Sequence, residues 1–276
     1  MDQTIEILLL GVLQGIAEFL PISSSGHLII SAAALEEWTG KQLPDFLELN
    51  IALHLGTLIS ILVVYWQRIV RLLSEDRRVI GLVVVATLPA VFVGLPLHEI
   101  ESLKGLLTSP LLTGWMLMVT GAMLLFGSRR PAGELDYTQL SYKKALTIGV
   151  VQAVAILPGI SRSGSTIVGG LCTGLRRDAA ATFSFLMAIP VTAGAVILEG
   201  KDLLTEASAG SRDLWASLPL LLGAVVSFVV GVIALHWLIQ WLRAGKLHQF
   251  AWWCIPLGAA VVMWQMFDTT TTIAAK

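Results

Sequence analysis

Apolar residues in this chain gather into long runs with few charges, and short polar segments separate the runs. A helix needs about 20 mainly apolar residues to cross the hydrocarbon core of a bilayer, which is roughly 30 Å thick. Runs of this length predict an all-α integral membrane protein. Its six transmembrane helices are expected near residues 46–66, 79–97, 111–128, 179–198, 214–242 and 249–267.

Two further apolar regions are interrupted in the middle. Residues 5–35 contain Pro21, and residues 144–175 contain Pro158, each within a turn rich in Ser and Gly. A helix rises only 1.5 Å per residue, so the short arms on either side cannot cross the bilayer. We therefore predict two re-entrant helical hairpins. Irregular backbone at that depth is tolerated only where protein or water covers it.

Composition supports a membrane protein. Of the 276 residues, 55% are hydrophobic and only 13% are charged, whereas soluble domains carry about 25% charged residues. This excludes an ordinary soluble domain, a disordered chain and a collagen-like chain. The net charge is -1, and no basic arm indicates a nucleic-acid partner.

Basic residues are unequally shared between the two sides of the predicted bundle. One side receives only Lys41, Lys104, Lys201, Arg212 and Lys276. The positive-inside rule places the opposite, richer side in the cytoplasm and both termini outside. That richer side receives Arg68, Arg71, Arg77, Arg78, Arg129, Arg130, Lys143, Lys144, Arg176, Arg177, Arg243 and Lys246.

The two broken regions resemble each other. Residues 11–14 match residues 149–152, and residues 22–26 match residues 160–164 with an offset of 138 residues. Three spans follow each motif, and charge places the hairpins on opposite sides. We therefore predict one membrane domain, 1–276, built as an inverted-topology repeat. Its halves are 1–127 and 144–267, joined by the polar linker 128–143.

Polar residues inside the broken regions are the functional candidates, because ionisable groups in a membrane are costly. Gln14 and Glu18 lie four residues apart on one helical face. Superposing the halves predicts that Glu18, His27 and Arg162 share a pocket. Arg binds phosphate oxygens in pairs, glycine turns offer backbone N–H groups to anions, and Ser or His can attack phosphorus or move a proton.

Simpler interpretations stand beside this one. The Glu18 side chain could pair with an arginine for folding alone. Serines near glycines often serve packing or helix capping. His54, in the first long span, is interpreted as a packed, hydrogen-bonded histidine and is left out of the candidate site.

The motifs resemble one known family. Residues 14–27 and 158–166 are similar to the two signatures of the undecaprenyl-pyrophosphate phosphatases of the bacitracin-resistance type. Residues 52–57 and 183–190 also fit, so the resemblance covers essentially the whole chain. That family allows Glu or Gln at the position of Gln14, and Ser165 stands where Ala is common.

The resemblance implies an inner-membrane hydrolase that converts undecaprenyl diphosphate to undecaprenyl phosphate and inorganic phosphate. This reaction recycles the lipid carrier for peptidoglycan and opposes bacitracin. The family is also associated with a divalent metal ion (Mg²⁺ or Ca²⁺), a site that faces outside, and homodimers. Expected partners are the prenyl diphosphate substrate and membrane lipids, with no nucleic acid.

The resemblance also assigns roles residue by residue. Glu18 would bind the metal or support the histidine together with Gln14, and Arg162 would clamp the diphosphate. Ser24 and His27 would supply the nucleophile and the base, in an order that the sequence leaves open. The remaining substrate-binding candidates are Ser23, Ser25, Gly26, Gly159, Ser161, Ser163, Gly164 and Thr166.

Two alternatives compete with this assignment. Inverted repeats with broken helices are also the architecture of secondary transporters and lipid flippases. The phosphatidate-phosphatase type of membrane enzyme carries a Ser-Gly-His element, which residues 25–27 match. That type also requires an upstream basic motif and a downstream Arg-His-Asp motif, and this sequence has neither.

Overall fold

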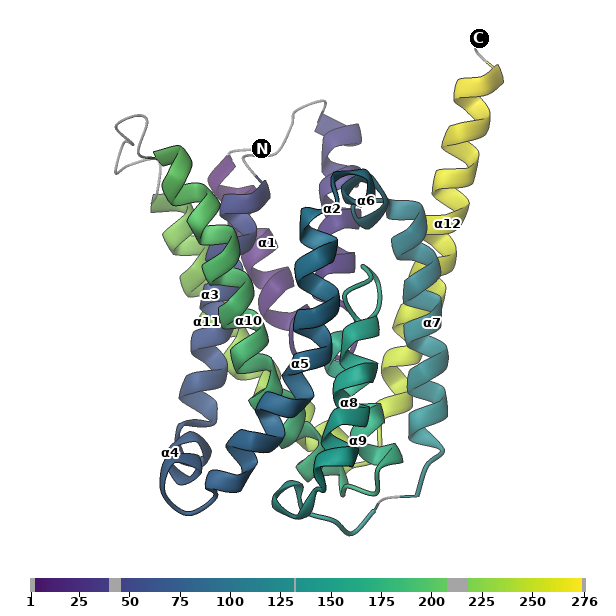
Figure 1. Cartoon of the computed structure of the whole chain (residues 1–276). Coiled ribbons are helices and arrows are strands. Elements are labelled where there is room, and N and C mark those ends of the chain that lie inside the picture. Colours follow the sequence, from purple (N-terminus) through teal and green to yellow (C-terminus); the bar gives the residue numbers. More distant parts are fainter. Residues whose placement is uncertain (1–2, 40–45, 132, 208–217, 275–276) are drawn as a thin grey trace.

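The computed structural model describes residues 3–39, 46–131, 133–207 and 218–274. Over these residues the chain is almost entirely helical, apart from one isolated bridge between Leu135 and Leu175. The expected all-α membrane protein is therefore confirmed. The beginning of α1 and the end of α12 lie at the same end of the bundle, opposite to α4 (Figure 1).

The helices follow one another with short connections. The first half of the chain contains α1 (Gln3–Ala17), α2 (Ser24–Thr39), α3 (Phe46–Val64), α4 (Trp66–Ser74), α5 (Arg77–Glu99), α6 (Glu101–Leu107) and α7 (Pro110–Ser128). The second contains α8 (Tyr142–Val154), α9 (Arg162–Cys172), α10 (Arg177–Ala207), α11 (Leu218–Arg243) and α12 (Ala251–Ala274), with short 3₁₀ turns η1 (Tyr137–Gln139) and η2 (Leu247–Phe250).

Five described helical segments are long and apolar enough to cross a membrane: α5, α7, α10, α11, and η2 together with the first part of α12. A sixth span results if α3 and α4 are counted together, although the chain bends by 66° between them. The bend falls where the apolar run ends, because α4 begins at Trp66 and carries Arg68 and Arg71. Residues 214–217 of the predicted fifth span lie outside the described residues.

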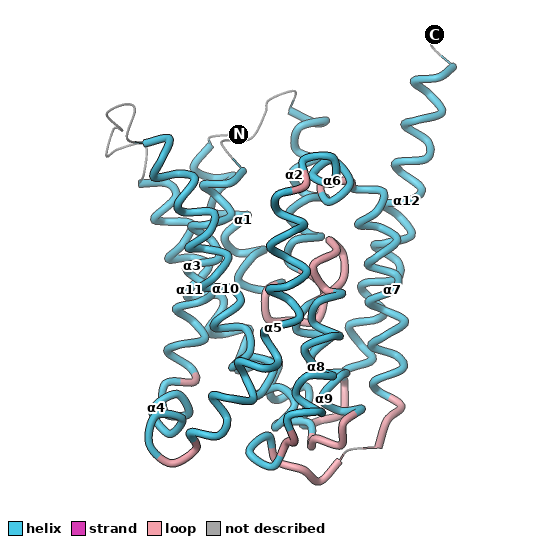
Figure 2. The backbone as a smooth tube through the Cα atoms, in the orientation of Figure 1, coloured by secondary structure: helices cyan, strands magenta, loops and turns pink. Residues whose placement is uncertain are grey.

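Each broken region forms two short helices joined by an irregular turn, residues 18–23 in the first and 155–161 in the second. The longest of these helices, α2, has 16 residues, which corresponds to about 24 Å and is too short to cross the bilayer alone. Figure 2 shows both turns midway between the two ends of the bundle. Irregular backbone at that depth is surrounded by helices.

The hairpins pack against spans from the other half of the chain. Helix α1 packs on α11, and α8 packs on α5. In the order of the predicted repeat, α1 corresponds to α8 and α5 to α11. The first helix of each hairpin thus packs on the corresponding span of the other half, as expected for two inverted halves. The division into 1–127 and 144–267 stays a prediction.

The first turn is anchored in the apolar core. Phe19 is fully buried and Leu20 nearly so. The Phe19 ring packs edge-to-face on Phe185 of α10, with ring centroids 5.8 Å apart, a contact worth about 0.5–1.5 kcal/mol beyond the buried area. This anchor fixes the backbone next to Glu18.

Candidate functional site

Glu18 is the centre of the site. It follows the last residue of α1, and its residue is only 8% exposed. Its Oε1 atom lies 2.6 Å from Arg162 Nη2. Its Oε2 atom accepts hydrogen bonds from Ser24 Oγ at 2.6 Å and from Gln14 Nε2 at 3.1 Å. A charged group this buried needs such partners, and both hairpins supply them.

Two serine caps position the groups that reach Glu18. Ser23 Oγ accepts the N–H of Gly26 at the start of α2, and Ser161 Oγ accepts the N–H of Gly164 at the start of α9. Such caps satisfy free N–H groups of the first turn. Each cap therefore sets the next residue, Ser24 or Arg162, at the first position of its helix. Ser23 adopts a left-handed φ of 71° to do so.

The two turns are held together by direct contacts. Thr120 of α7 donates to the carbonyl of Gly159 and accepts the N–H of Ser161. Ser163 Oγ donates to the carbonyl of Leu20 in the first turn. A Cβ atom on Gly26 would lie only 3.0 Å from Gly159 Cα, so the absence of side chains lets the hairpins approach.

A small cavity opens between the two turns. Its volume is about 40 Å³, which is room for about three water-sized groups. Six of the expected site residues line it: Glu18, Ser23, Ser24, Ser25, Ser161 and Arg162. Other lining residues are Ala17, Ala155 and Ile160.

The other expected residues lie around this cavity. Gln14 contacts Glu18 from the preceding helical turn. Gly26, Gly159, Ser163 and Gly164 form the contacts between and within the turns. Thr166 is buried one turn into α9, where its Oγ1 atom bonds to the Arg162 carbonyl and to Ser184 Oγ.

His27 does not join Glu18 and Arg162. Its Nδ1 atom lies 2.7 Å from the carbonyl oxygen of Ser23, and its Nε2 atom accepts a hydrogen bond from Trp253 Nε1 at 2.8 Å. Both ring nitrogens are thus engaged, which corresponds to a neutral ring with its proton on Nδ1. The expectation that His27 shares the pocket of Glu18 is not met in this arrangement.

His54 takes the place near Glu18 instead. Its Nε2 atom lies 3.6 Å from Glu18 Oε2, and its Nδ1 atom lies 2.9 Å from the carbonyl oxygen of Asn50 on α3. His54 is not among the residues that the sequence predicts at the site. An ionisable side chain within an apolar span was the available signal, and only the packing of α3 against the first hairpin shows which carboxylate it approaches.

Two buried polar atoms beside Glu18 have no hydrogen-bond partner within the described residues. They are Arg162 Nη1 and Gln14 Oε1. An unpaired buried polar atom costs about 1–3 kcal/mol, so both atoms are suited to contact a ligand. The guanidinium offers a donor to an anion, and the amide oxygen offers an acceptor to a cation.

The fold and the site define a multi-pass membrane protein with a polar cluster, built on a carboxylate and a guanidinium, between two broken hairpins. Residues 7–260 match the model of the bacitracin resistance protein BacA family, and the chain belongs to that family. The resemblance seen in the two sequence signatures is thereby confirmed.

Relatives of similar length carry one name, undecaprenyl-diphosphatase. The protein of Rhodopirellula baltica is 52% identical over 263 residues, which cover 95% of this chain and 98% of the relative. Those of Desulfatibacillum aliphaticivorans and Methanosphaera stadtmanae are 39% and 34% identical over 284 and 286 residues. These alignments cover 94% and 95% of this chain, and 98% of each relative.

Proposed function

We propose that this protein is a membrane hydrolase that converts undecaprenyl diphosphate to undecaprenyl phosphate and inorganic phosphate. The family and the name of its relatives support this function. In the structure, the observation that carries it is the Glu18 carboxylate, which contacts Arg162 and Ser24 at 2.6 Å each. The reaction renews the lipid carrier for cell-wall synthesis and opposes bacitracin. Neither the family assignment nor the contacts of Glu18 favour the alternative of a transporter or flippase.

Arg162 is the proposed phosphate clamp. Its Nη2 atom holds Glu18, and its buried Nη1 atom has no partner in the described part of the chain. A planar guanidinium can contact two phosphate oxygens at once. As the arginine turns its contacts to the substrate, the Glu18 carboxylate is released to accept a proton. Arg162 then stabilises the charge that grows on the phosphoryl oxygens.

Ser24 is the proposed nucleophile, because its hydroxyl already donates to a carboxylate, the arrangement of an activated nucleophile. A bond forms between Ser24 Oγ and the terminal phosphorus, while the bond from that phosphorus to the bridging oxygen breaks. Glu18 takes the serine proton and passes it to the leaving undecaprenyl phosphate. Water then cleaves the phosphoserine: one water proton goes to Glu18 and on to Ser24 Oγ, and inorganic phosphate leaves.

The two histidines receive different roles. His54 faces Glu18 Oε2 at 3.6 Å and orients the carboxylate during proton transfer. His27 is held by Ser23 and Trp253, and its role in this proposal is to stabilise the first turn. We therefore propose Ser24, and not His27, as the nucleophile.

We also propose a divalent cation, Mg²⁺ or Ca²⁺, as cofactor. Both ions prefer oxygen ligands, and Mg²⁺ is commonly held by one or two carboxylates together with substrate phosphates. Glu18 and the unpaired Gln14 Oε1 atom fit that donor set and would hold the ion. The described residues contain no group of three His, Cys, Asp or Glu side chains suited to a metal. When bound, the cation would draw charge from the phosphate oxygens.

An apolar groove supports a lipid substrate. It lies between α1 and α2, has a volume of about 290 Å³, and is lined by Glu6, Leu9, Leu10, Leu13, Ser31, Ala34, Leu35 and Trp38. Leu13 lies one turn before Ala17, which lines the polar cavity, and residues four apart share a helix face. We propose that the prenyl chain occupies this groove.

Placement in the cell is also part of the proposal. We propose the bacterial inner membrane, with the active site open to the outside, because the basic residues gather at the α4 end of the bundle. A homodimer is carried over from the family resemblance alone.

The function is tested by phosphate release from undecaprenyl diphosphate by the purified protein, with and without a chelator. Ser24→Ala is expected to be inactive, whereas Ser128→Ala, outside the site, should retain wild-type turnover. Substrate labelled in its terminal phosphate should leave acid-stable label on wild-type protein and none on Ser24→Ala. If wild type releases no phosphate with either cation, the proposed function is wrong. If Ser24→Ala turns over normally, only the nucleophile is wrong.

A further inference from the structure

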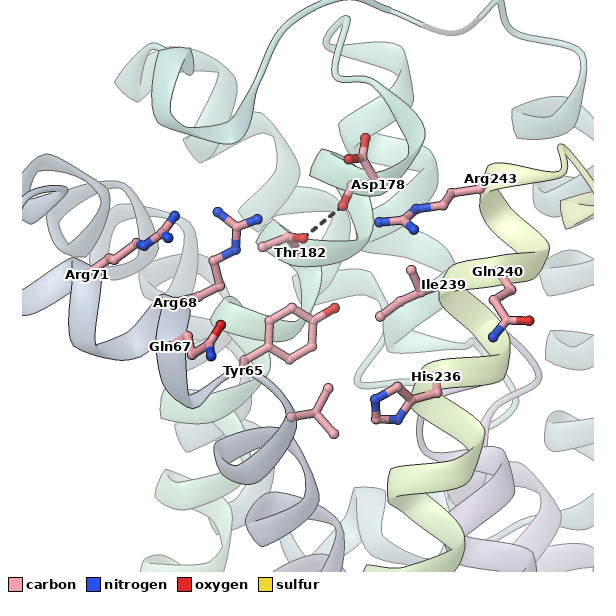
Figure 3. Close-up of a pocket in the computed structure, with 11 residues that line it drawn as sticks. Tyr65, Gln67, Arg68, Arg71, Asp178, Thr182, His236, Ile239, Gln240 and Arg243 are labelled. Carbon is pink, nitrogen blue, oxygen red and sulfur yellow. Dashed lines mark hydrogen bonds between the residues drawn. The ribbon is translucent and has the colours of Figure 1, made fainter.

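A second polar cavity lies at the bend between α3 and α4, at the end of the bundle where the basic residues gather. Its volume is about 400 Å³. Helices α3, α4, α10 and α11 enclose it, and none of its lining residues belongs to the Glu18 cavity. Figure 3 shows the side chains that surround it.

The cavity is strongly positive. Arg68 and Arg71 reach it from α4, and Arg243 reaches it from the end of α11. The acidic residue in its lining is Asp178, whose carboxylate is already paired with Arg176 Nε at 3.0 Å. Among the described residues, none of the three arginines forms an ion pair. Arg68 also lies within hydrogen-bond reach of the Tyr137 hydroxyl. No carboxylate of the described residues neutralises any of the three guanidinium groups, so their positive charge is available to an anion.

Tyr65 adds a hydroxyl directed into this space. The residue is 6% exposed, and Phe185 packs against its ring at 5.8 Å between centroids. The hydroxyl itself is buried, and Thr182 lies beside it. The Thr182 hydroxyl donates to the carbonyl of Asp178 instead, and no hydrogen bond of good geometry reaches the Tyr65 hydroxyl within the described structure. Figure 3 shows it pointing between α10 and α11, with Arg68 and Arg243 on either side. A buried hydroxyl without a well-aligned hydrogen bond is rare, and a ligand would supply one.

An apolar groove along α11 adjoins the polar cavity. This groove has a volume of about 550 Å³ and shares His236 and Gln240 with the polar cavity. Ile233 and Trp237, which also line it, are 64% and 43% exposed. A charged pocket beside an exposed apolar helix face suits a molecule with an anionic head and an apolar tail.

We propose that this cavity binds a membrane lipid whose head group is a phosphate monoester. The phosphate would contact Arg68, Arg71, Arg243 and the Tyr65 hydroxyl, and the chain would lie along Ile233 and Trp237. Arginine is suited to phosphate because it forms paired hydrogen bonds, and basic residues at a membrane surface attract anionic lipids. The inference does not depend on the proposed hydrolysis.

The same arginines also help to set the orientation of the protein, so the test must separate charge from binding. Dioleoyl phosphatidic acid is titrated into the full-length protein in detergent, and bound lipid is counted by native mass spectrometry. Phosphatidylcholine and inorganic phosphate are the comparison ligands. Phosphatidic acid is expected to bind at least about tenfold more tightly than phosphatidylcholine, since a hydrogen bond to a charged group is worth about a factor of ten or more. It should also bind at least about tenfold more tightly than inorganic phosphate, because burial of each CH₂ group of its chains adds about 0.8 kcal/mol.

Matched variants locate the site. Arg68→Gln and Arg243→Gln should each weaken binding of phosphatidic acid about tenfold, whereas Arg77→Gln, at the same end but outside the cavity, should not. Tyr65→Phe removes no charge and should still weaken binding. Ile233→Ser should weaken binding of the lipid, and Val229→Ser, one turn away on an exposed position, should not. Elution of each variant as wild type by size exclusion shows that it is folded.

Three results would overturn the inference. Equal affinity of wild type and the Arg68→Gln, Arg243→Gln double variant would remove the phosphate site. If Arg77→Gln weakened binding as much as Arg68→Gln or Arg243→Gln, the effect would come from surface charge and not from the cavity. Free phosphate, and not a lipid, would be the ligand if wild type bound inorganic phosphate and phosphatidic acid with equal affinity and if Ile233→Ser bound phosphatidic acid as tightly as wild type.

Discussion

The guanidinium of Arg162 meets the carboxylate of Glu18 at 2.6 Å, across 144 residues of sequence. Ser24 reaches the other oxygen of the same carboxylate, also at 2.6 Å. Ser24 and Arg162 occupy matching positions in the two repeated motifs, each one residue after a capping serine. One carboxylate thus receives a hydroxyl from the first hairpin and a positive charge from the second.

Replacement of Glu18 tests the role of its charge. Glu18→Gln keeps the size of the side chain but cannot take the proton from Ser24, so turnover should fall roughly 10²- to 10⁴-fold. Gln14→Ala should have a smaller effect, because an amide supplies no charge. Phosphate release is measured on protein that elutes as wild type by size exclusion. Near wild-type turnover of Glu18→Gln would make the carboxylate structural.

Replacement of Arg162 tests the phosphate clamp. Loss of one preorganised contact typically costs about 3–4 kcal/mol of transition-state stabilisation, or roughly a hundred- to thousand-fold in rate. Arg162→Lys should be clearly impaired, because lysine offers a point charge, and Arg162→Ala should be worse. The exchange Glu18→Arg with Arg162→Glu could restore an ion pair but not an oriented phosphate site. Recovered activity in that exchange would refute the clamp.

The two histidines should respond differently to glutamine. His54→Gln removes the group that faces Glu18, and we expect kcat to fall about tenfold or more. His27→Gln breaks the bond with Trp253 and should lower the free energy of unfolding by about 1 kcal/mol, with kcat largely retained. Thermal unfolding and phosphate release are measured on both. A stable but inactive His27→Gln protein would show that His27 takes part in the reaction.

Much of this architecture follows from the sequence because hydrophobic length is a local property. Spans such as α5 and α7 follow from uninterrupted apolar runs, and the two broken regions follow from Pro21, Pro158 and their glycines. The serine caps follow from the repeated motif. These features depend only on residues that are close together in the sequence.

Features that depend on contacts between distant helices could not be predicted in the same way. His27 looked like a partner of Glu18, but its ring bonds to Trp253, 226 residues away. His54 looked like a packing residue, yet α3 carries it to the carboxylate. The bend at Tyr65 gathers arginines from α4 and α11, and nothing in the local pattern shows that they share a cavity.

Topology can be tested with single cysteines in a background that carries Cys172→Ala and Cys254→Ala. The charge distribution predicts Gln67 in the cytoplasm and Ser208 outside. Ser208 lies outside the described residues, and exposed Glu36 near the end of α2 is a second position on the outer side. In intact cells an impermeant thiol reagent should label cysteine at 36 and 208 but not at 67. Equal labelling of all three would contradict the six-span arrangement.

Gly159 should be the least replaceable small residue of the second turn. Its φ of +92° is rare for other residues, and a Cβ atom there would lie 2.4 Å from the carbonyl oxygen of Thr113. A strained backbone of this kind costs about 1–3 kcal/mol. The turn would have to shift, and Arg162 would move with it.

We therefore expect Gly159→Ala to lower both the melting temperature and the turnover number, since a displacement near 1 Å can cost about a hundredfold in rate. Gly194→Ala is the matched control. Gly194 lies within α10 with open space around its Cβ position, and alanine favours a helix over glycine by roughly 1 kcal/mol. It should be at least as stable as wild type and equally active. If Gly159→Ala matches Gly194→Ala in both measurements, the close approach of the two turns is not needed to place Arg162.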